Sequence, residues 1–278
     1  MSLQDLLAKR SASMRNKATS FVNKNPEAKK IGYFVYEKDP NHVKFMKLCE
    51  YLKEEFSIIQ VTGEEICSGI LESDGFDCLI IPGGYHVEHY KHMGGEEGGA
   101  AVRRAVNSGV GYIGICAGAY SACSVLPDEP IHSFCPTWNL LPQCKLKERQ
   151  EPEYLWKRGM GECNIRLNKM GIDHLGHVSS DVKMFYRNGP CLEVLECECE
   201  TSNECKAECH VLGLFDCDFD NENVKPGVLK NSASIVVGEH GQGKIFVYSA
   251  HPEASDPDVV VPMLIKSIRY VCTKNKLN

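Results

Sequence analysis

The sequence contains no run of apolar residues that approaches the roughly 18 needed for a membrane-spanning helix. It also has no excess of basic residues, because 37 acidic residues outnumber 31 Lys and Arg and give a net charge of −6. A basic face is the usual electrostatic signature of nucleic-acid binding. The sequence therefore predicts a soluble globular protein with neither a membrane nor a nucleic acid as partner.

The N-terminus lacks the apolar stretch of a secretory signal peptide. Residues 1–29 are rich in Lys, Arg and Ser, and we expect a solvated helix or tail there, with a mitochondrial presequence as the alternative. The 15 cysteines, in a chain without a secretory signal, are expected to be mostly reduced thiols in the cytoplasm. Residues 30–278 are expected to form one domain, because no repeat or interdomain linker interrupts them.

Short apolar segments alternate with helical patterns in the first half of the sequence. The apolar segments are 31–36, 57–61, 77–81 and 111–115, and the helical patterns cover 43–52, 62–71 and 98–107. Such alternation indicates βαβ units, and strands without a polar face indicate a parallel sheet that is buried on both sides. We therefore expect an α/β fold of the doubly wound, flavodoxin-like type.

The second half of the sequence has a different pattern. Residues 127–176 contain prolines, glycines and mixed charges, and their periodicity is too weak to assign elements. The later apolar runs, which turn residues separate, are 182–186, 192–196, 210–215, 234–237 and 244–248. We expect these runs to be antiparallel strands added to the sheet, followed by a helix over 257–272.

The strongest chemical signal is the segment Gly114-Ile115-Cys116-Ala117-Gly118. It follows an expected strand and precedes a helical segment of small residues, which is the arrangement of a nucleophile elbow with Cys in place of Ser. The turn places the thiol at a helix N-terminus, where free N–H groups favour the thiolate. A Cys between glycines is more often a packing solution, but sites in open α/β sheets lie at the carboxyl ends of strands, where Cys116 is expected.

A glycine pair follows the preceding expected strand. Gly83 and Gly84 allow the backbone to approach a substrate closely, and their N–H groups, with that of Ala117, can form an oxyanion hole. The alternative interpretation is a plain turn.

The third motif is His251-Pro252-Glu253, directly after the last expected strand. On an extended segment, side chains at positions i and i+2 point the same way, so the carboxylate can orient the imidazole and stabilise its charged form. A lone His after a strand is more often structural. A carboxylate at i+2, in a chain that also offers an elbow Cys, favours a Cys-His-Glu triad.

Together these motifs resemble the class I glutamine-amidotransferase superfamily, in which a Cys elbow, an upstream Gly-Gly loop and a late His-x-Glu form the site. The resemblance spans about residues 30–275. The segments 114–120, 188–190 and 249–253 are most similar to one branch, the biotin-protein ligase N-terminal-domain-like family, whose members also occur as stand-alone proteins.

The resemblance implies that Cys116 is the nucleophile, His251 the general base and Glu253 its orienter. Tyr85 and Tyr120, which follow the Gly-Gly loop and the elbow, are expected to contact a small amide or acyl substrate. No cofactor or metal is expected.

The sequence departs from the superfamily pattern at Ala119-Tyr120. Glutamine-hydrolysing members usually have Gly and then Gln or Met there, so the resemblance does not carry glutamine over as the substrate. Nothing in the chain resembles the ligase half, so biotin transfer is not expected. Because no synthetase domain is recognised either, any ammonia released would need a synthetase or ligase as partner protein.

Two polar clusters are open to more than one interpretation. They are Cys197, Cys199, Cys205, Cys209 and His210, and then His86, His89 and His92 around Glu88. The first can be free thiols, a disulfide or a metal site, and its spacing, which is not that of a standard zinc site, favours free thiols. The second can bind metal, but a polar helix face near the mouth of the site is the favoured interpretation.

Three functions fit these motifs. The first is a thiol-dependent hydrolase or amidotransferase that acts on an amide or related acyl bond. The second is a non-catalytic binding or regulatory module that keeps the elbow. The third is redox sensing by Cys116.

Overall fold

The computed structural model describes residues 21–36, 42–125, 137–146, 158–176, 179–195, 209–219 and 227–273. No helix within these ranges is long and apolar enough to cross a membrane. Most of the expected N-terminal tail lies outside the described residues. Phe21, at the start of the described part, pairs with Ile58 through two backbone hydrogen bonds of 2.9 and 2.7 Å. The chain therefore already contacts the sheet at Phe21, and the boundary at residue 30 stays a prediction.

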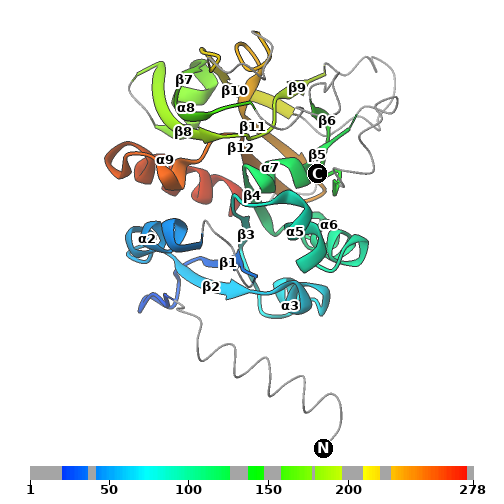
Figure 1. Cartoon of the computed structure of the whole chain (residues 1–278). Coiled ribbons are helices and arrows are strands. Elements are labelled where there is room, and N and C mark those ends of the chain that lie inside the picture. Colours follow the sequence, from blue (N-terminus) through cyan, green and yellow to red (C-terminus); the bar gives the residue numbers. More distant parts are fainter. Residues whose placement is uncertain are drawn as a thin grey trace, which may run out of the picture.

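One large sheet runs through the molecule, from β2 at one end to β8 at the other (Figure 1). Its first five strands, in spatial order, are β2 (Ser57–Val61), β1 (Lys30–Phe34), β3 (Cys78–Ile81), β4 (Gly111–Ile115) and β12 (Gly243–Tyr248), all parallel to their neighbours. Every residue of β3 and β4 is buried, as expected for strands covered on both faces.

The sheet continues beyond β12 with antiparallel strands. These are β11 (Ala233–His240), β10 (Cys209–Phe215), β7 (Met160–Leu167) and β8 (Asp181–Arg187). Three short strands branch from this part: β9 (Leu192–Val194), β6 (Leu141–Leu146) and β5 (Cys123–Ser124). The predicted fold class, a mostly parallel sheet with antiparallel additions in the C-terminal half, is confirmed.

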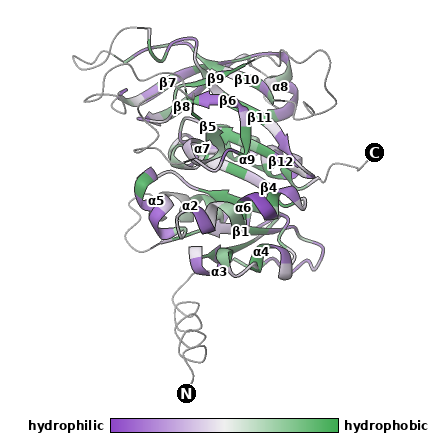
Figure 2. Cartoon of the chain, turned by 90° about the vertical axis from the view of Figure 1, so that its right-hand side faces the viewer, coloured by the Kyte–Doolittle hydropathy of each residue, from purple (hydrophilic) through white to green (hydrophobic). Residues whose placement is uncertain are grey.

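Helices cover both faces of the parallel part. On one face lie α2 (His42–Leu52) and α9 (Pro257–Val271), and on the other lie α3 (Gly63–Cys67), α4 (Ile70–Ser73), α5 (His86–His92) and α6 (Glu96–Asn107). The helix after β4 is α7 (Ala117–Ala122), and α8 (Lys169–Leu175) packs on α9. Hydrophobic residues follow the strands between the helices, whereas hydrophilic residues lie on the outer face of α6 (Figure 2). Two apolar cores therefore flank the sheet.

The structure corrects two expectations about secondary structure. Residues 127–176, to which no element was assigned, contain β6, β7 and α8. In β7 the buried residues alternate with polar ones, which is the period of a half-buried strand, but flanking glycines and charges hide it. The single helix expected over 62–71 is divided in two, because Gly69 adopts a left-handed φ of 86° between α3 and α4.

Close backbone packing fixes the turn between β4 and α7. A Cβ atom added to Gly118 would overlap the carbonyl oxygen of Ile81 at the end of β3, and one added to Gly114 would lie 2.5 Å from the carbonyl oxygen of Gly118. Only glycine permits these approaches. The turn after β4 can therefore sit directly against the end of β3.

We predict that Gly118→Ala destabilises the fold by about 1–3 kcal/mol, because the overlap with Ile81 outweighs the better helix propensity of Ala. Urea unfolding measures the change. Ser121→Ala is the matched control in the same helix, since it removes one hydrogen bond of 3.2 Å to Ala117 and should cost about 1 kcal/mol. A Gly118→Ala variant as stable as wild type would show that the turn relaxes freely.

Candidate active site

Cys116 occupies the predicted strand-to-helix turn. Its φ of 48° and ψ of −98° lie in a region that non-glycine residues rarely adopt and that costs about 1–3 kcal/mol. Its N–H donates to the carbonyl of Tyr248 at 2.8 Å, and its thiol donates to the carbonyl of Arg187 at 3.7 Å. Such strain persists only where the surroundings impose it, and it is typical of functional positions.

His251 and Glu253 form a buried pair after β12. The Nδ1 atom of His251 lies 2.6 Å from Oε1 of Glu253, and the two side chains are 4% and 1% exposed. The premise of an extended segment is wrong, because Pro252–Ala254 form a 3₁₀ turn. The turn brings the carboxylate back onto the imidazole, so the two groups meet by a different route from the one expected.

The protonation of His251 follows from its surroundings. Burial alone would lower the pKa of His251, but the carboxylate of Glu253 and the sulfur of Cys116 hold it well above 6.5. Since Nδ1 is occupied by Glu253, Nε2 is the ring nitrogen left for Cys116; Nε2 is buried and has no other partner among the described residues. The three predicted triad side chains therefore gather at one place.

The glycine pair after β3 packs closely against side chains of the site. A Cβ atom on Gly83 would lie 2.8 Å from Nδ1 of His251 and 3.3 Å from Oε1 of Glu253, so any larger residue would displace the pair. A Cβ atom on Gly84 would overlap Nε2 of His89. Both glycines are needed because side chains from α5 and from the segment after β12 press against this loop.

The interpretation of the α5 histidines as a polar face is wrong for His89, whereas His92 is exposed. His89 is fully buried, its ring nitrogens have no hydrogen-bond partner among the described residues, and it packs edge-on against Phe34. Burial, followed by the neighbouring charges of His86 and His92, lowers its pKa to about 3, so it is neutral at physiological pH. Within the described ranges no group of three His, Cys, Asp or Glu side chains could hold a metal ion.

Tyr85 and Tyr120 lie in different settings. Tyr85, just before α5, is 60% exposed. Tyr120 is buried, and its hydroxyl lies 3.3 Å from the carbonyl of Asn188 and accepts from Nη1 of Arg158 at 2.6 Å. Arg158 was not among the predicted site residues, because it stands in the stretch of weak periodicity and its partners are distant in sequence.

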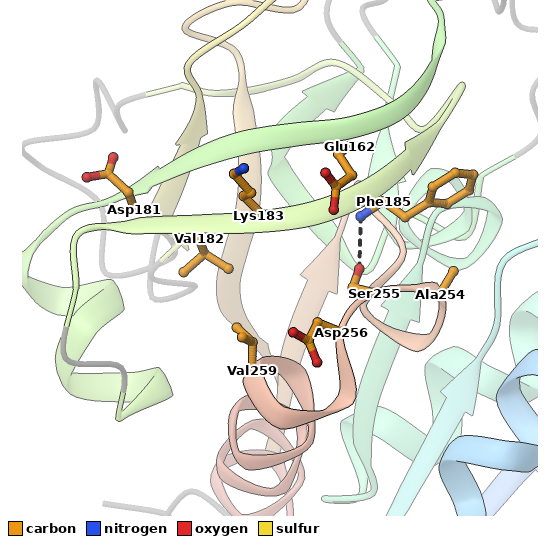
Figure 3. A pocket seen from close by; sticks show the side chains of 9 residues that line it. All are labelled: Glu162, Asp181, Val182, Lys183, Phe185, Ala254, Ser255, Asp256 and Val259. Atoms are coloured by element: carbon orange, nitrogen blue, oxygen red, sulfur yellow. Dashed lines mark hydrogen bonds between the residues drawn. The ribbon is translucent and has the colours of Figure 1, made fainter.

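A pocket of about 370 Å³ is lined by Ala254, Ser255 and Asp256, which directly follow the His251–Glu253 motif (Figure 3). Its wall includes Phe185 and Ser255, together with the charged side chains of Glu162, Asp181, Lys183 and Asp256. The N–H of His251 donates to the carbonyl of Phe185 at 2.7 Å, and the N–H of Phe185 donates to Ser255 Oγ at 2.8 Å. None of the predicted site residues lines this pocket, which adjoins the backbone of the site rather than its reactive groups.

The cysteine cluster is described only in part, because Cys197, Cys199 and Cys205 lie outside the described residues. Cys209, like Cys191 and Cys217, is a free thiol.

Residues 38–128 match the family described as biotin-protein ligase, N terminal. This match includes the Gly-Gly loop and the elbow but not the His-x-Glu motif. It confirms the predicted resemblance for the part of the chain that carries Cys116. No curated protein sequence matches the chain significantly.

Solved structures of similar fold cover most of the chain. The glutaminase domain of CTPS from Trypanosoma brucei, with bound acivicin, is 14% identical with a TM-score of 0.54 and covers 90% of this chain and 96% of its own. A glutamine amidotransferase from Thermotoga maritima is 10% identical with a TM-score of 0.51, covering 88% and 98%. A protein described as ThuA-like, from Bacteroides uniformis, is 12% identical with a TM-score of 0.54, covering 89% and 92%. These likenesses establish the glutamine-amidotransferase-like fold.

The buried pair predicts a pH-dependent stability. The fold binds a proton on His251 more tightly than the unfolded chain does, because the pKa of His251 is raised in the fold. This stabilising contribution is complete at pH values below 6.5, the pKa of His in an unfolded chain, and it is lost as the pH rises through the pKa of His251 in the fold. In Glu253→Gln burial dominates, so the pKa of His251 falls and the contribution disappears. The difference in unfolding free energy between wild type and variant should be larger at about pH 6 than at about pH 9.5, because the proton on His251 that Glu253 stabilises is bound at the lower pH.

Urea unfolding at both pH values measures this difference. Glu50→Gln, the same change at an exposed position of α2, should show no such dependence. A Glu253→Gln penalty that is equal at both pH values would show that the carboxylate does not control the proton of His251.

Proposed function

We propose that this protein is a cysteine-nucleophile hydrolase or amidotransferase that cleaves an amide or related acyl bond. The observation that carries the proposal is the buried His251–Glu253 pair, joined at 2.6 Å, beside a Cys116 held in a strained turn. A positive φ at Cys costs stability, and both this strain and a buried His–carboxylate pair with a perturbed pKa are typical of catalytic sites.

The geometry supports a two-step acyl transfer. Protonated His251 favours the thiolate of Cys116, which attacks the carbonyl carbon and forms a tetrahedral intermediate. His251 gives its proton to the leaving nitrogen, the carbon–nitrogen bond breaks, and a thioester remains on Cys116. Water then attacks the thioester with His251 as base, which releases the acid and restores the thiol. Glu253 keeps the imidazole oriented and balances its charge throughout.

The oxyanion of the intermediate needs donors beside Cys116. Ala117 is the first residue of α7, where helix geometry leaves the N–H without an intrahelical partner. Gly83 packs against the His251–Glu253 pair, and Gly84 packs against His89. We assign Ala117, Gly83 and Gly84 to the oxyanion hole, because α7 begins against the end of β3, which this glycine pair follows.

A partner protein is part of the proposal. If the leaving group is ammonia, we propose that a synthetase or ligase partner protein supplies the acceptor that receives it. Tyr85 and Val87, 60% and 58% exposed at the start of α5, lie next to the Gly-Gly loop and offer an apolar surface to such a partner.

A non-catalytic binding module is the second candidate function. Cys116 is only 5% exposed, and this burial favours a module that keeps the elbow without using its thiol. The ThuA-like structure shows that this fold is not confined to glutamine amidotransferases.

We predict that Cys116 is alkylated faster than any other thiol at neutral pH, because the imidazole of His251 beside it can take up its proton. Limited labelling with iodoacetamide, followed by mass-spectrometric mapping, gives the rate at each Cys. Cys272, which is partly exposed at the end of α9, serves as the internal reference. Labelling of Cys116 at or below the rate of Cys272 would remove the nucleophile assignment.

We also predict that Glu253→Gln acylates at Cys116 at least about 100-fold more slowly than wild type, because the imidazole loses the group that orients and charges it. Acylation by a panel of amides and activated esters, glutamine included, is followed by intact mass. Cys116→Ala should not react at the site, and Glu50→Gln should react like wild type. An unchanged rate in Glu253→Gln would refute the triad, whatever Cys116 does.

A further inference from the structure

A buried positive charge lies close to Cys116 and takes no part in the mechanism above. Arg158 is 3% exposed, and its Nη1 atom donates to the hydroxyl of Tyr120 at 2.6 Å and to the carbonyl of Gly189 at 3.2 Å. Among the described residues no carboxylate forms an ion pair with it. The guanidinium is therefore held by neutral acceptors alone.

Such an arrangement is costly without an anion. A buried guanidinium loses its hydration, and a phenol and a carbonyl accept hydrogen bonds without supplying a compensating negative charge. Two acceptors also leave most of its five N–H donors for other groups. Arginine in this state is suited to an oxyanion that arrives from outside, because its planar donor fork matches the two oxygens of a carboxylate.

One backbone segment, residues 187–189, contacts both the thiol of Cys116 and the guanidinium of Arg158, and we call this segment the shared wall. Three successive carbonyls contact, in order, the thiol of Cys116 (3.7 Å), the hydroxyl of Tyr120 (3.3 Å) and the guanidinium of Arg158 (3.2 Å). They belong to the segment 187–189. Tyr120 also lies four residues after Cys116, and its N–H donates to the carbonyl of Cys116 at 3.0 Å.

The wall is rigid rather than a loose loop. Asn188 has a left-handed φ of 51°, and its Oδ1 atom accepts from the N–H groups of Arg158 and Gly159 at 2.8 and 3.1 Å. Gly189 is packed so tightly on Ser249, two residues before His251, that a Cβ atom there would overlap the Ser249 carbonyl. The segment 187–189, whose Gly189 carbonyl accepts from the guanidinium, is thus fixed to the segment that carries His251.

We propose that Arg158 binds a carboxylate of the acyl substrate that Cys116 attacks, so that the enzyme selects carboxylate-bearing acyl compounds. This inference rests on the proposed function and names its substrate class. Tyr120, the phenol that holds the guanidinium, stands at one of the two positions where the sequence departs from glutamine-hydrolysing relatives. The departure therefore coincides with a different means of substrate recognition.

The test compares pairs of esters that differ only in charge. The mono-4-nitrophenyl esters of succinate, glutarate and adipate carry a carboxylate, and their methyl-capped counterparts do not. In each reaction the thiolate displaces 4-nitrophenolate and forms a thioester, so the increase in intact mass, compared with that of Cys116→Ala, reports acylation of Cys116. For at least one chain length, wild type should react at least tenfold faster with the charged ester. Absence of any preference at every length would overturn the proposal.

The variant Arg158→Gln should lose this preference, with at least a tenfold slower reaction of the charged ester and less than a twofold change for the neutral one. Arg166→Gln, the same change at an exposed arginine of β7, is the matched control and should keep the preference. Equal losses on both esters would show that Arg158 only supports the structure, and would overturn the proposal. The wild-type comparison needs no variant and stands if Arg158→Gln does not fold.

A binding experiment separates this inference from the proposed function. If no ester acylates Cys116 in wild type, the proposed function fails. Calorimetry on Cys116→Ala with glutarate and with neutral glutaramide then tests the anion site alone. Binding of glutarate but not of glutaramide, lost in Cys116→Ala/Arg158→Gln, supports the site, whereas equal binding or none of either refutes it.

Discussion

The site depends on the parallel pairing of β4 with β12. This pairing places Ile115 beside Tyr248, and the N–H of Cys116 extends it by one more bond to the Tyr248 carbonyl at 2.8 Å. Because both strands end at the same edge of the sheet, the residues that follow them must share the space beyond it. The strained turn at Cys116 on one side and the 3₁₀ turn after His251 on the other are two ways of leaving the sheet at that edge, and together they bring thiol and imidazole into contact.

Two buried histidines show how one neighbour decides the charge of a side chain. His89 and His251 are both removed from water, yet the pKa of His89 is lowered to about 3 whereas that of His251 is raised well above 6.5. The difference is the carboxylate of Glu253, which together with the sulfur of Cys116 outweighs the cost of burial. His89 instead meets aromatic rings and the Gly84 backbone, so it can only fill space. Burial in this protein is therefore a poor guide to function until the partner is known.

The sequence predicted those parts that local patterns encode. The bounds of β2 and β4 agree with the expected 57–61 and 111–115, because apolar runs in a buried parallel sheet need no knowledge of their neighbours. The His251–Glu253 pair was expected from its spacing, although through an extended segment that does not exist. Arg158 and the burial of His89 could not be predicted, because each depends on contacts with residues far away in the sequence.

The order of synthesis bears on when the β4–β12 pairing can form, because β4 is made well before β12. The elbow is complete by α7, whereas its histidine follows the last strand, so about half of the sequence separates the two. Contacts of high sequence separation form late, since the intervening chain must be ordered first. A nascent chain leaving the ribosome would therefore carry Cys116 without its histidine until β12 had been added. The thiol and the imidazole would then meet only in a nearly finished molecule.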